Sequence, residues 1–265
     1  MSAGAGSAAI AAPHIVGGSP VPSSDKYPWI AALLDVNRRV PGGTDQDMQI
    51  CGASLIDSDS VLTAAHCINV GPRYLRVVLG RAQLSASGGE VRQVLRSYEH
   101  PNYTGGSNEN YDVAVLTLDK PVTGITPVKL PSSTDNWYEQ PGKQLTAAGW
   151  GNTMSASGGP NTDRMQETKV TAVSDADAAK IYPTKFVPEL MMAAGEQGKG
   201  ACYGDSGGPL FASYIRLRGS TQPPSGPFQY GITSDGETVC ATNPAIYTEV
   251  NAPSIREFIT TSMNK

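Results

Sequence analysis

The sequence lacks the features that would point to a membrane or to nucleic acid. None of its 265 residues belong to an apolar stretch of about 20, so we expect no membrane-spanning helix. Lys and Arg number 20 against 24 Asp and Glu, which leaves a net charge of −4 with no basic cluster. Contact with nucleic acid or an anionic membrane surface depends on such a cluster. We therefore expect no nucleic-acid and no membrane partner.

Histidine and cysteine are scarce as well, which limits the metal chemistry. The chain has three His and four Cys, and no pair of cysteines has the C-x-x-C spacing of a zinc site. We therefore expect no metal and no other cofactor. The cysteines, Cys51, Cys67, Cys202 and Cys240, form an even set, which indicates disulfides and an oxidising compartment. Three pairings are possible, and the sequence alone leaves the choice open.

Glycine and proline, in contrast, are abundant, with 29 and 20 residues. They separate many short apolar runs, which favours an all-β sandwich or barrels over alternating βαβ units. One helix is predicted at the C-terminus, where residues 254–257 have the pattern of a capping box, and a short one over 175–180. The predicted strands cover residues 29–34, 49–56, 61–64, 75–79, 91–98, 113–118, 144–148, 166–173, 209–214, 228–233 and 245–250.

Ser206 stands in the glycine-rich segment Gly-Asp-Ser-Gly-Gly-Pro at 204–209 and is the candidate nucleophile. A serine hydroxyl attacks a carbonyl only if an imidazole takes its proton and a third group orients that imidazole. His66 in Ala-Ala-His-Cys is the candidate base, and Asp112 in Asn-Tyr-Asp-Val is the candidate orienting group. The glycines leave room for a substrate carbonyl and permit a tight turn that aims N–H groups at the developing oxyanion.

The order of these residues along the chain discriminates among serine hydrolases. Ser206 also fits the G-x-S-x-G pattern of α/β-hydrolases, in which the histidine follows the serine. His14, His66 and His100 all precede Ser206, so that assignment fails. The order His66, Asp112, Ser206 is that of the chymotrypsin type.

Five motifs in sequence order resemble those of the trypsin/chymotrypsin family of serine proteases. The resemblance implies an all-β fold of two six-stranded antiparallel β-barrels with a C-terminal helix and the active site in the cleft between the barrels. We expect the N-terminal barrel at 15–130 and the C-terminal barrel with its helix at 131–265. The motifs are Ile-Val-Gly-Gly at 15–18, Ala-Ala-His-Cys at 64–67, Asp112 before an apolar run, Gly-Trp-Gly at 149–151, and the segment 204–209.

The resemblance also implies which cysteines form disulfides and which groups bind the oxyanion. It pairs Cys51 with Cys67, beside the histidine, and Cys202 with Cys240, beside the substrate pocket. It assigns the oxyanion hole to the backbone N–H groups of Gly204 and Ser206.

Residues 1–14 are interpreted as an activation segment or an expression remnant. In the family, a cut before Ile15 frees an α-amino group that pairs with the buried carboxylate of Asp205, because a buried charge needs a partner. The residue before the cut is His14 rather than Arg or Lys. We therefore expect an activating protease without tryptic preference, or autolysis.

The resemblance places the primary substrate pocket at Gly200, Ser234, Gly236 and Ala245. Gly200 stands where trypsin-like enzymes carry Asp and brings no charge for Arg or Lys, and Gly236 and Ala245 are small. We therefore expect a chymotrypsin- or elastase-like pocket and cleavage after Phe, Tyr, Leu or Met. Asp235 replaces the family's usual tryptophan, so the outer subsites are expected to bind weakly or to prefer basic residues.

Smaller expectations concern residues outside the motifs. Arg81 stands where calcium-binding members begin their loop with Glu, so we expect no calcium there. We interpret His100 as a surface-loop residue and Trp150 as a packing residue. The loops at 37–47 and 218–227 look enlarged and are expected on the surface.

Together these observations predict a secreted, extracellular and monomeric serine endopeptidase. Its partners would be protein or peptide substrates and protein inhibitors. The alternative is a catalytically inactive protease homologue that acts as a binding module. Such homologues usually have a broken triad or oxyanion loop, whereas every element is present here. An esterase on the same fold is a second alternative, because the acyl chemistry is shared.

Overall fold

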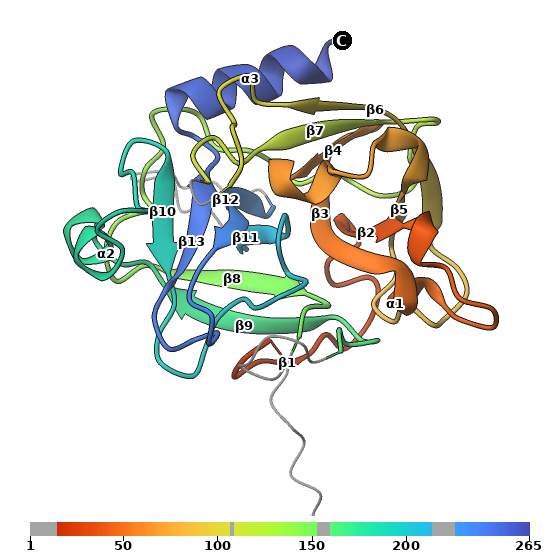
Figure 1. Ribbon diagram of the computed structural model, residues 1–265, viewed down its shortest axis with the longest axis horizontal. Helices are drawn as coiled ribbons and strands as arrows, with labels where there is room; N and C mark the ends of the chain where they lie inside the picture. The colour runs from red at the N-terminus through yellow and green to blue at the C-terminus, as the bar shows by residue number, and fades with distance from the viewer. Residues whose placement is uncertain (1–14, 107–108, 153–159, 214–225) are drawn as a thin grey trace, which may run out of the picture.

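The computed structural model describes residues 15–106, 109–152, 160–213 and 226–265 (Figure 1). The predicted activation segment 1–14 and most of the predicted loop 218–227 lie outside the described residues. Two units built of β-strands lie side by side, the first half of the chain on the right of Figure 1 and the second half on the left. The predicted all-β fold with few helices is confirmed.

Six antiparallel strands from the first half close into a barrel in the order β2-β3-β4-β7-β6-β5. Aliphatic side chains such as Ile30, Leu55, Leu62 and Val77 fill it and have no exposed surface. Branched aliphatic residues suit this position because they pack well on a pleated, buried face. The strands are β2 (Ile30–Asp35), β3 (Gln49–Asp57), β4 (Ser60–Thr63), β5 (Leu75–Leu79), β6 (Glu90–Glu99) and β7 (Ala114–Leu118).

The second half of the chain forms a sheet in the order β1-β9-β8-β11-β12-β13-β10. An isolated antiparallel bridge between Ala172 and Ala194 links its β9 and β10 sides. The sheet therefore consists of six strands from the second half and one two-residue strand from the N-terminal segment. The strands are β1 (Ser19–Pro20), β8 (Gln144–Gly149), β9 (Gln166–Thr171), β10 (Met191–Ala194), β11 (Pro209–Ala212), β12 (Phe228–Asp235) and β13 (Ala245–Glu249).

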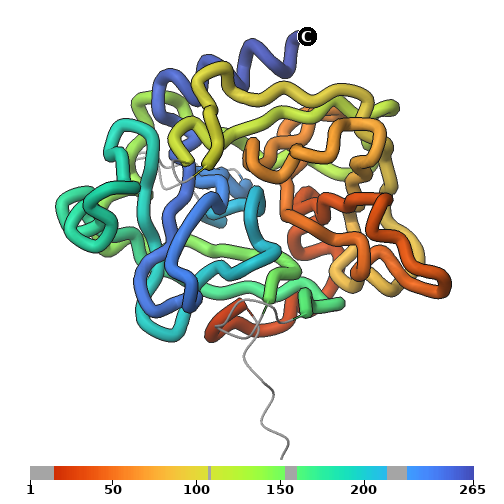
Figure 2. The backbone as a smooth tube through the Cα atoms, in the orientation of Figure 1, coloured from red at the N-terminus to blue at the C-terminus, as the bar shows by residue number. Residues whose placement is uncertain are grey.

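Each end of the described chain packs on the opposite unit (Figure 2). The N-terminal strand β1 joins the second sheet, and the C-terminal helix α3 covers the first barrel. At the N-terminal end, β1 pairs with β9, with Ser19 opposite Glu167. At the C-terminal end, α3 (Pro253–Met263) packs against β7 of the barrel. Ile255 and Ile259 on this helix are fully buried.

The other helices are short, and none among the described residues is long and apolar enough to cross a membrane. The predicted helix at 175–180 is confirmed as α2 (Asp175–Ile181), which Ser174 caps by accepting a hydrogen bond from Asp177 N at 3.1 Å. The remaining helices are η1 (Val36–Arg38), α1 (Asp45–Met48), η2 (Ala65–Ile68) and η3 (Pro72–Tyr74).

The predicted capping box at the start of α3 is wrong. The N-cap residue is Ala252, which offers no side-chain hydrogen bond, and Ser254 lies inside the first turn. Pro253 explains the earlier start, since proline is favourable at the first helical position, where its missing N–H would be unpaired anyway.

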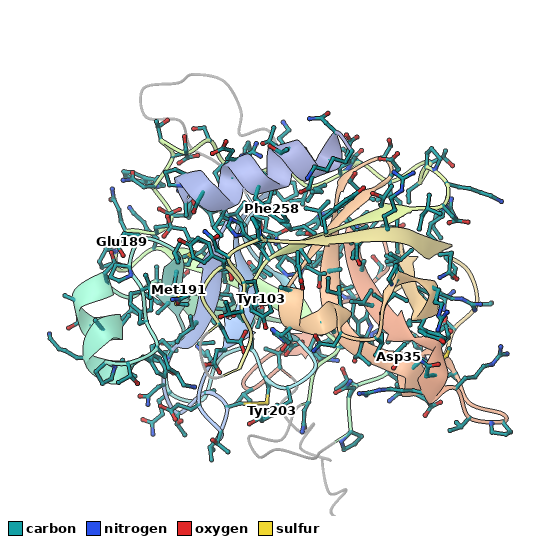
Figure 3. All side chains as sticks on the ribbon, turned by 45° about the horizontal axis from the view of Figure 1, so that its top comes forward. Asp35, Tyr103, Glu189, Met191, Tyr203 and Phe258 are labelled. Carbon is teal, nitrogen blue, oxygen red and sulfur yellow. A yellow bond between two sulfur atoms is a disulfide. The ribbon has the colours of Figure 1, made fainter. Side chains whose placement is uncertain are left out.

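The interpretation of His100 as a surface residue is also wrong. His100 is 5% exposed and stacks on Tyr111 with ring centroids 4.6 Å apart. Phe258, which lies below α3 in Figure 3, covers it at a centroid distance of 5.0 Å. No sequence motif indicates that the C-terminal helix covers this loop. Trp150, in contrast, is buried as predicted, and its Nε1 donates to the carbonyl of Ala82 at 3.1 Å.

The enlarged loop at 37–47 includes the end of η1 and the first residues of α1. Asp45 of α1 forms an ion pair with Arg81, which is only 9% exposed. The Nε of Arg81 also donates to the carbonyl of Gly88 at 2.9 Å. A cationic guanidinium therefore occupies the turn for which we expect no calcium.

Candidate active site

His66 is held by the chain geometry that follows β4. The strand ends at Thr63, and the turn of η2 carries His66 toward the second sheet. A disulfide joins the next residue, Cys67, to Cys51 of β3. The imidazole Nδ1 lies 2.8 Å from Oδ2 of Asp112, and the backbone N–H of His66 donates to Oδ1 of Asp112 at 3.0 Å. These two contacts fix the position and the orientation of the ring.

Asp112 is fully buried two residues before the start of β7 and is held from both units. Ser234 of β12 donates a hydrogen bond from its hydroxyl to Oδ2 of Asp112 at 2.6 Å. Thr248 of β13 donates to the backbone carbonyl of Asp112 at 2.9 Å. The family resemblance places Ser234 in the pocket wall, and no sequence motif indicates its contact with this carboxylate.

The pKa of His66 is raised above its ordinary value of 6.5. Burial acts in the opposite direction, since it disfavours the charged imidazolium. The hydrogen bond and the negative charge of Asp112 outweigh burial, and the nearby carboxylates of Glu109 and Asp235 add to the rise. The site therefore stabilises a positive charge on this ring.

Ser206 lies in a turn that is pressed against the first barrel. Its carbonyl accepts a hydrogen bond from the N–H of Gly52 on β3 at 2.7 Å. Gly207 has φ +76°, and a Cβ there would lie 2.2 Å from Oγ1 of Thr63. Only glycine fits this contact, which brings the serine turn beside the strand that leads into η2. The Ser206 hydroxyl forms no hydrogen bond to another described residue.

Gly204 is the second residue whose backbone conformation requires glycine. Its φ is +91°, and a Cβ would lie 2.5 Å from Oδ1 of Asn161. Gln49 holds the turn by donating from Nε2 to the carbonyl of Gly204 at 2.9 Å. Within the described parts of the chain, the N–H groups of Gly204 and Ser206 have no acceptor. Two backbone donors are thus available beside the candidate nucleophile.

Asp205 is buried between these two donors. Its carboxylate accepts hydrogen bonds from the N–H groups of Gly151 at 2.8 Å and Cys202 at 3.0 Å. Burial raises its pKa to about 7, although both hydrogen bonds act to lower it. No Lys, Arg or His of the described residues forms an ion pair with it. Ile15 is also fully buried, and the carbonyl of Val16 accepts from the N–H of Gly200 at 3.1 Å.

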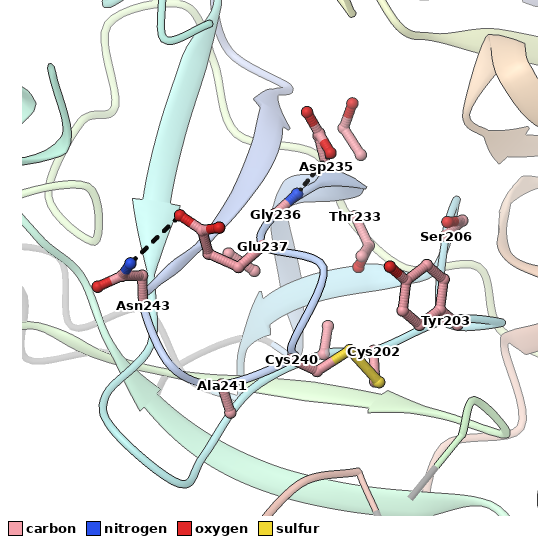
Figure 4. A pocket seen from close by; sticks show the side chains of 13 residues that line it. Cys202, Tyr203, Ser206, Thr233, Asp235, Gly236, Glu237, Cys240, Ala241 and Asn243 are labelled. Carbon is pink, nitrogen blue, oxygen red and sulfur yellow. Dashed lines mark hydrogen bonds between the residues drawn. A yellow bond between two sulfur atoms is a disulfide. The ribbon is translucent and has the colours of Figure 1, made fainter. Parts of the chain in front are cut away.

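A pocket of about 100 Å³ opens beside Ser206 (Figure 4). A disulfide between Cys202 and Cys240 borders it, so both disulfides have the pairing that the resemblance implies. Tyr203 stands at its edge, where its hydroxyl donates to the carbonyl of Thr238 at 3.2 Å. The lining residues include Ser234, Asp235, Gly236, Glu237, Asn243 and Ala245.

Three of the four predicted pocket residues line this cavity, and Gly200 does not. Tyr203 and Glu237 are among the lining residues that the sequence does not predict, because their side-chain directions depend on contacts that the sequence does not reveal. Glu237 accepts a hydrogen bond from Nδ2 of Asn243 at 3.3 Å (Figure 4).

Two groups of side chains near His66 have the residue types of metal ligands. The first is Cys51, His66 and Cys67, but the two cysteines form a disulfide and offer no thiolate. The second is His66, Glu109 and Asp112, in which the carboxylate of Asp112 already accepts hydrogen bonds from His66 and Ser234.

Comparison with known proteins agrees with this geometry. A model of the trypsin family matches residues 15–259. The chain belongs to the trypsin family. A trypsin from Saccharopolyspora erythraea is 34% identical over 243 residues, covering 90% of this chain and 94% of the relative. Kallikrein-15 from Homo sapiens is 33% identical over 238 residues, covering 84% of this chain and 82% of the relative.

Membership of the trypsin family makes the chain a serine endopeptidase, which is a hydrolase. A further relative, trypsin 5G1 from Aedes aegypti, is 36% identical over 203 residues and covers 74% of this chain. The predicted fold is the trypsin fold, with a closed six-stranded barrel, a second sheet and a C-terminal helix.

Proposed function

We propose that this trypsin-family protein hydrolyses peptide bonds through an acyl-enzyme formed on Ser206. His66 serves as the base and Asp112 as the group that orients it. The observation that carries this proposal is the 2.8 Å contact between Nδ1 of His66 and Oδ2 of Asp112 beside the Ser206 turn. Because Nδ1–H donates to the carboxylate, Nε2 of the neutral ring remains as the proton acceptor.

In the proposed reaction, the oxygen of Ser206 bonds to the scissile carbonyl carbon while His66 Nε2 takes the hydroxyl proton. The tetrahedral intermediate then breaks its C–N bond, and the imidazolium gives its proton to the leaving amine. Water repeats both steps on the acyl-enzyme and releases the acid and the free serine. The raised pKa of His66 favours the imidazolium that each attack produces. Catalytic hydrogen bonds are often long without substrate, so we expect the Ser206–His66 contact to tighten on binding.

The oxyanion hole is proposed to be the backbone N–H groups of Gly204 and Ser206. The support is that neither group has another acceptor in the described chain. Fixed donors of this kind stabilise the charge that develops in the transition state, and the loss of one typically costs ~3 kcal/mol.

Activation is proposed to follow a cut before Ile15, which makes the chain a zymogen. The support comes from Asp205, whose buried carboxylate lacks a cation among the described residues. A freed α-amino group would supply that charge and lock the turn that carries Gly204 and Ser206. His14 and the rest of the proposed activation segment lie outside the described residues.

The proposed preference is for Phe, Tyr, Leu or Met before the scissile bond, as in a chymotrypsin- or elastase-like pocket. The small residues Gly236 and Ala245 leave the cavity walls open. The two lining carboxylates are already engaged, Asp235 with Lys185 at 2.7 Å and Glu237 with Asn243. The carboxylate of Asp235 is therefore ion-paired and that of Glu237 is hydrogen-bonded, and the small wall residues favour an apolar side chain.

We further propose that the protein is secreted and acts outside the cell as a monomer, because its two disulfides suit an oxidising compartment. Its substrates are proteins or peptides, and protein inhibitors would bind the same cleft. The proposed barrels span 15–130 and 131–265.

The decisive experiment treats the activated protein with a phosphonate that labels catalytic serines and with a panel of peptide anilides. We expect labelling at Ser206, cleavage after apolar residues, and loss of both in Ser206→Ala. The control variant Ser87→Ala, at an exposed position, should behave as the wild type. A preference for Arg or Lys would overturn the pocket assignment. Absence of labelling and turnover would favour the inactive binding module, and turnover of esters alone would favour an esterase.

A further inference from the structure

A carboxylate that no sequence motif predicts lies next to the candidate base. Glu109 precedes Asp112 by three residues in the loop between β6 and β7. One carboxylate oxygen of Glu109 lies within 4.8 Å of both a ring nitrogen of His66 and a carboxylate oxygen of Asp112. Figures 1 and 3 show this loop beside the turn of η2 that carries His66.

Glu109 is half-buried and is held in place by a neutral donor. Tyr103, labelled in Figure 3, donates from its hydroxyl to Oε2 of Glu109 at 2.9 Å. Burial raises the pKa of Glu109, and the charge of Asp112 adds to the rise. Among the described residues, no Lys or Arg forms an ion pair with Glu109. Among the described residues, the nearby imidazole of His66 is therefore the group that can bring a positive charge to this carboxylate, and no lysine or arginine pairs with it.

Two other carboxylates next to the candidate triad, those of Asp235 and Asp112, are held by more partners than Glu109. Asp235 pairs with Nζ of Lys185 at 2.7 Å and accepts from the N–H of Gly236 at 2.7 Å. Asp112 is bound by His66 and Ser234, as described above. Glu109 thus differs from both, because only the hydroxyl of Tyr103 and the nearby imidazole balance its charge.

The direction of a bound substrate places one particular side chain near Glu109. The residue before the scissile bond would enter the pocket of the second sheet, lined by Ser234, Gly236 and Ala245. Successive side chains of an extended peptide point in opposite directions. The preceding residue therefore turns toward the first barrel, which is the side that carries Glu109.

We propose that Glu109 forms a subsite for a cationic side chain, Lys or Arg, at the substrate residue immediately preceding the one that enters the pocket. The inference rests on the proposed function of Ser206 and His66. A charge-assisted hydrogen bond to a half-buried carboxylate is stronger than an exposed ion pair. We expect Lys at this substrate position to raise kcat/KM about tenfold over Gln.

The test uses three peptide anilides that share an apolar residue before the scissile bond and carry Lys, Gln or Glu at the position before it. Wild-type protein, Glu109→Gln and the control Glu257→Gln, at an exposed position on α3, are activated and compared. We expect the order Lys, Gln, Glu for the wild type and the control. In Glu109→Gln the ratio of Lys to Gln should fall to within about twofold of one, since the charge is gone.

The salt dependence of the wild-type protein tests the subsite even if Glu109→Gln folds poorly. The ratio of Lys to Gln in the wild type should fall as NaCl is raised, because salt screens an ion pair that is only partly buried. A wild-type ratio near one, a ratio that ignores salt, or a ratio that survives in Glu109→Gln would each overturn the subsite. Failure of the wild type to cleave any anilide or to bind the phosphonate would overturn the proposed function as well, which is a separate result.

Discussion

The hydroxyl of Ser234 donates a hydrogen bond to Oδ2 of Asp112 at 2.6 Å, across the interface between the two β units. Ser234 belongs to β12 of the second sheet, and Asp112 lies two residues before β7 of the first barrel. The same oxygen contacts Nδ1 of His66. The orientation of the imidazole therefore depends on how the two units meet.

Replacing Ser234 with Ala should lower the free energy of unfolding by about 1–3 kcal/mol. The change leaves a buried, charged acceptor with one donor fewer, and nothing in the fold replaces it. Urea denaturation of the two proteins measures the difference. The variant Ser87→Ala, at an exposed loop position, should change stability by no more than about 0.5 kcal/mol. Equal effects of the two substitutions would contradict this account of Ser234.

The acid limb of kcat/KM should have its midpoint above 6.5, the ordinary pKa of histidine. The proposed reaction needs neutral His66, and Asp112 stabilises the protonated ring against the opposing effect of burial. On this limb, activity rises as His66 loses its proton and is lost as pH falls through the raised pKa. Initial rates at low substrate from about pH 5 to 9 give the profile. A midpoint below 6.5 would contradict the role of Asp112.

Replacing Asp205 with Asn should flatten the pH dependence of stability in the uncut chain. Burial raises the pKa of Asp205 to about 7 from 3.8, so the folded state disfavours its ionised form. This loss of folding stability is absent at a pH below 3.8, the pKa in the unfolded chain. It grows as pH rises toward about 7, the pKa in the folded chain, and is complete above that pH. It amounts to roughly 3–5 kcal/mol. Urea denaturation at both ends of this range measures it, and an unchanged slope in Asp205→Asn would refute the assignment.

The two disulfides should contribute unequally to stability. The bridge between Cys202 and Cys240 spans 38 residues, whereas that between Cys51 and Cys67 spans 16. A longer closed loop removes more entropy from the unfolded chain, which predicts losses of about 4 and about 3 kcal/mol when each pair is replaced by Ala. Denaturation of the two double variants tests the order. A larger loss at Cys51 and Cys67 would indicate that contacts around His66 outweigh loop length.

The strands could be predicted wherever aliphatic and β-branched residues alternate between turn residues. Residues 75–79 were predicted as a strand and form β5 with the same ends. Strand β10 (Met191–Ala194) was missed because Met and Ala carry no preference for extended structure, and the strand forms through its pairing with β13. Strand β1 was missed because two residues that include a proline show no periodicity.

The candidate site was predictable only where a motif carries its own chemistry. Ser206 and His66 each stand in such a motif, and the glycines beside Ser206 have the conformations that the tight turn requires. Glu109 and Tyr203 were missed, since their importance comes from contacts that only the folded chain brings about. The three-residue spacing from Glu109 to Asp112 was the one available signal, and it is too common to carry an assignment.

The crossing of the chain ends makes the two halves of the molecule mutually dependent. If the two halves were separated, the first half would form its barrel without the helix α3. The second half would form its sheet without the edge strand β1. Neither piece could shield its own apolar surface. If the connection between the halves is cut, we therefore expect the two pieces to remain folded only while they stay associated with each other.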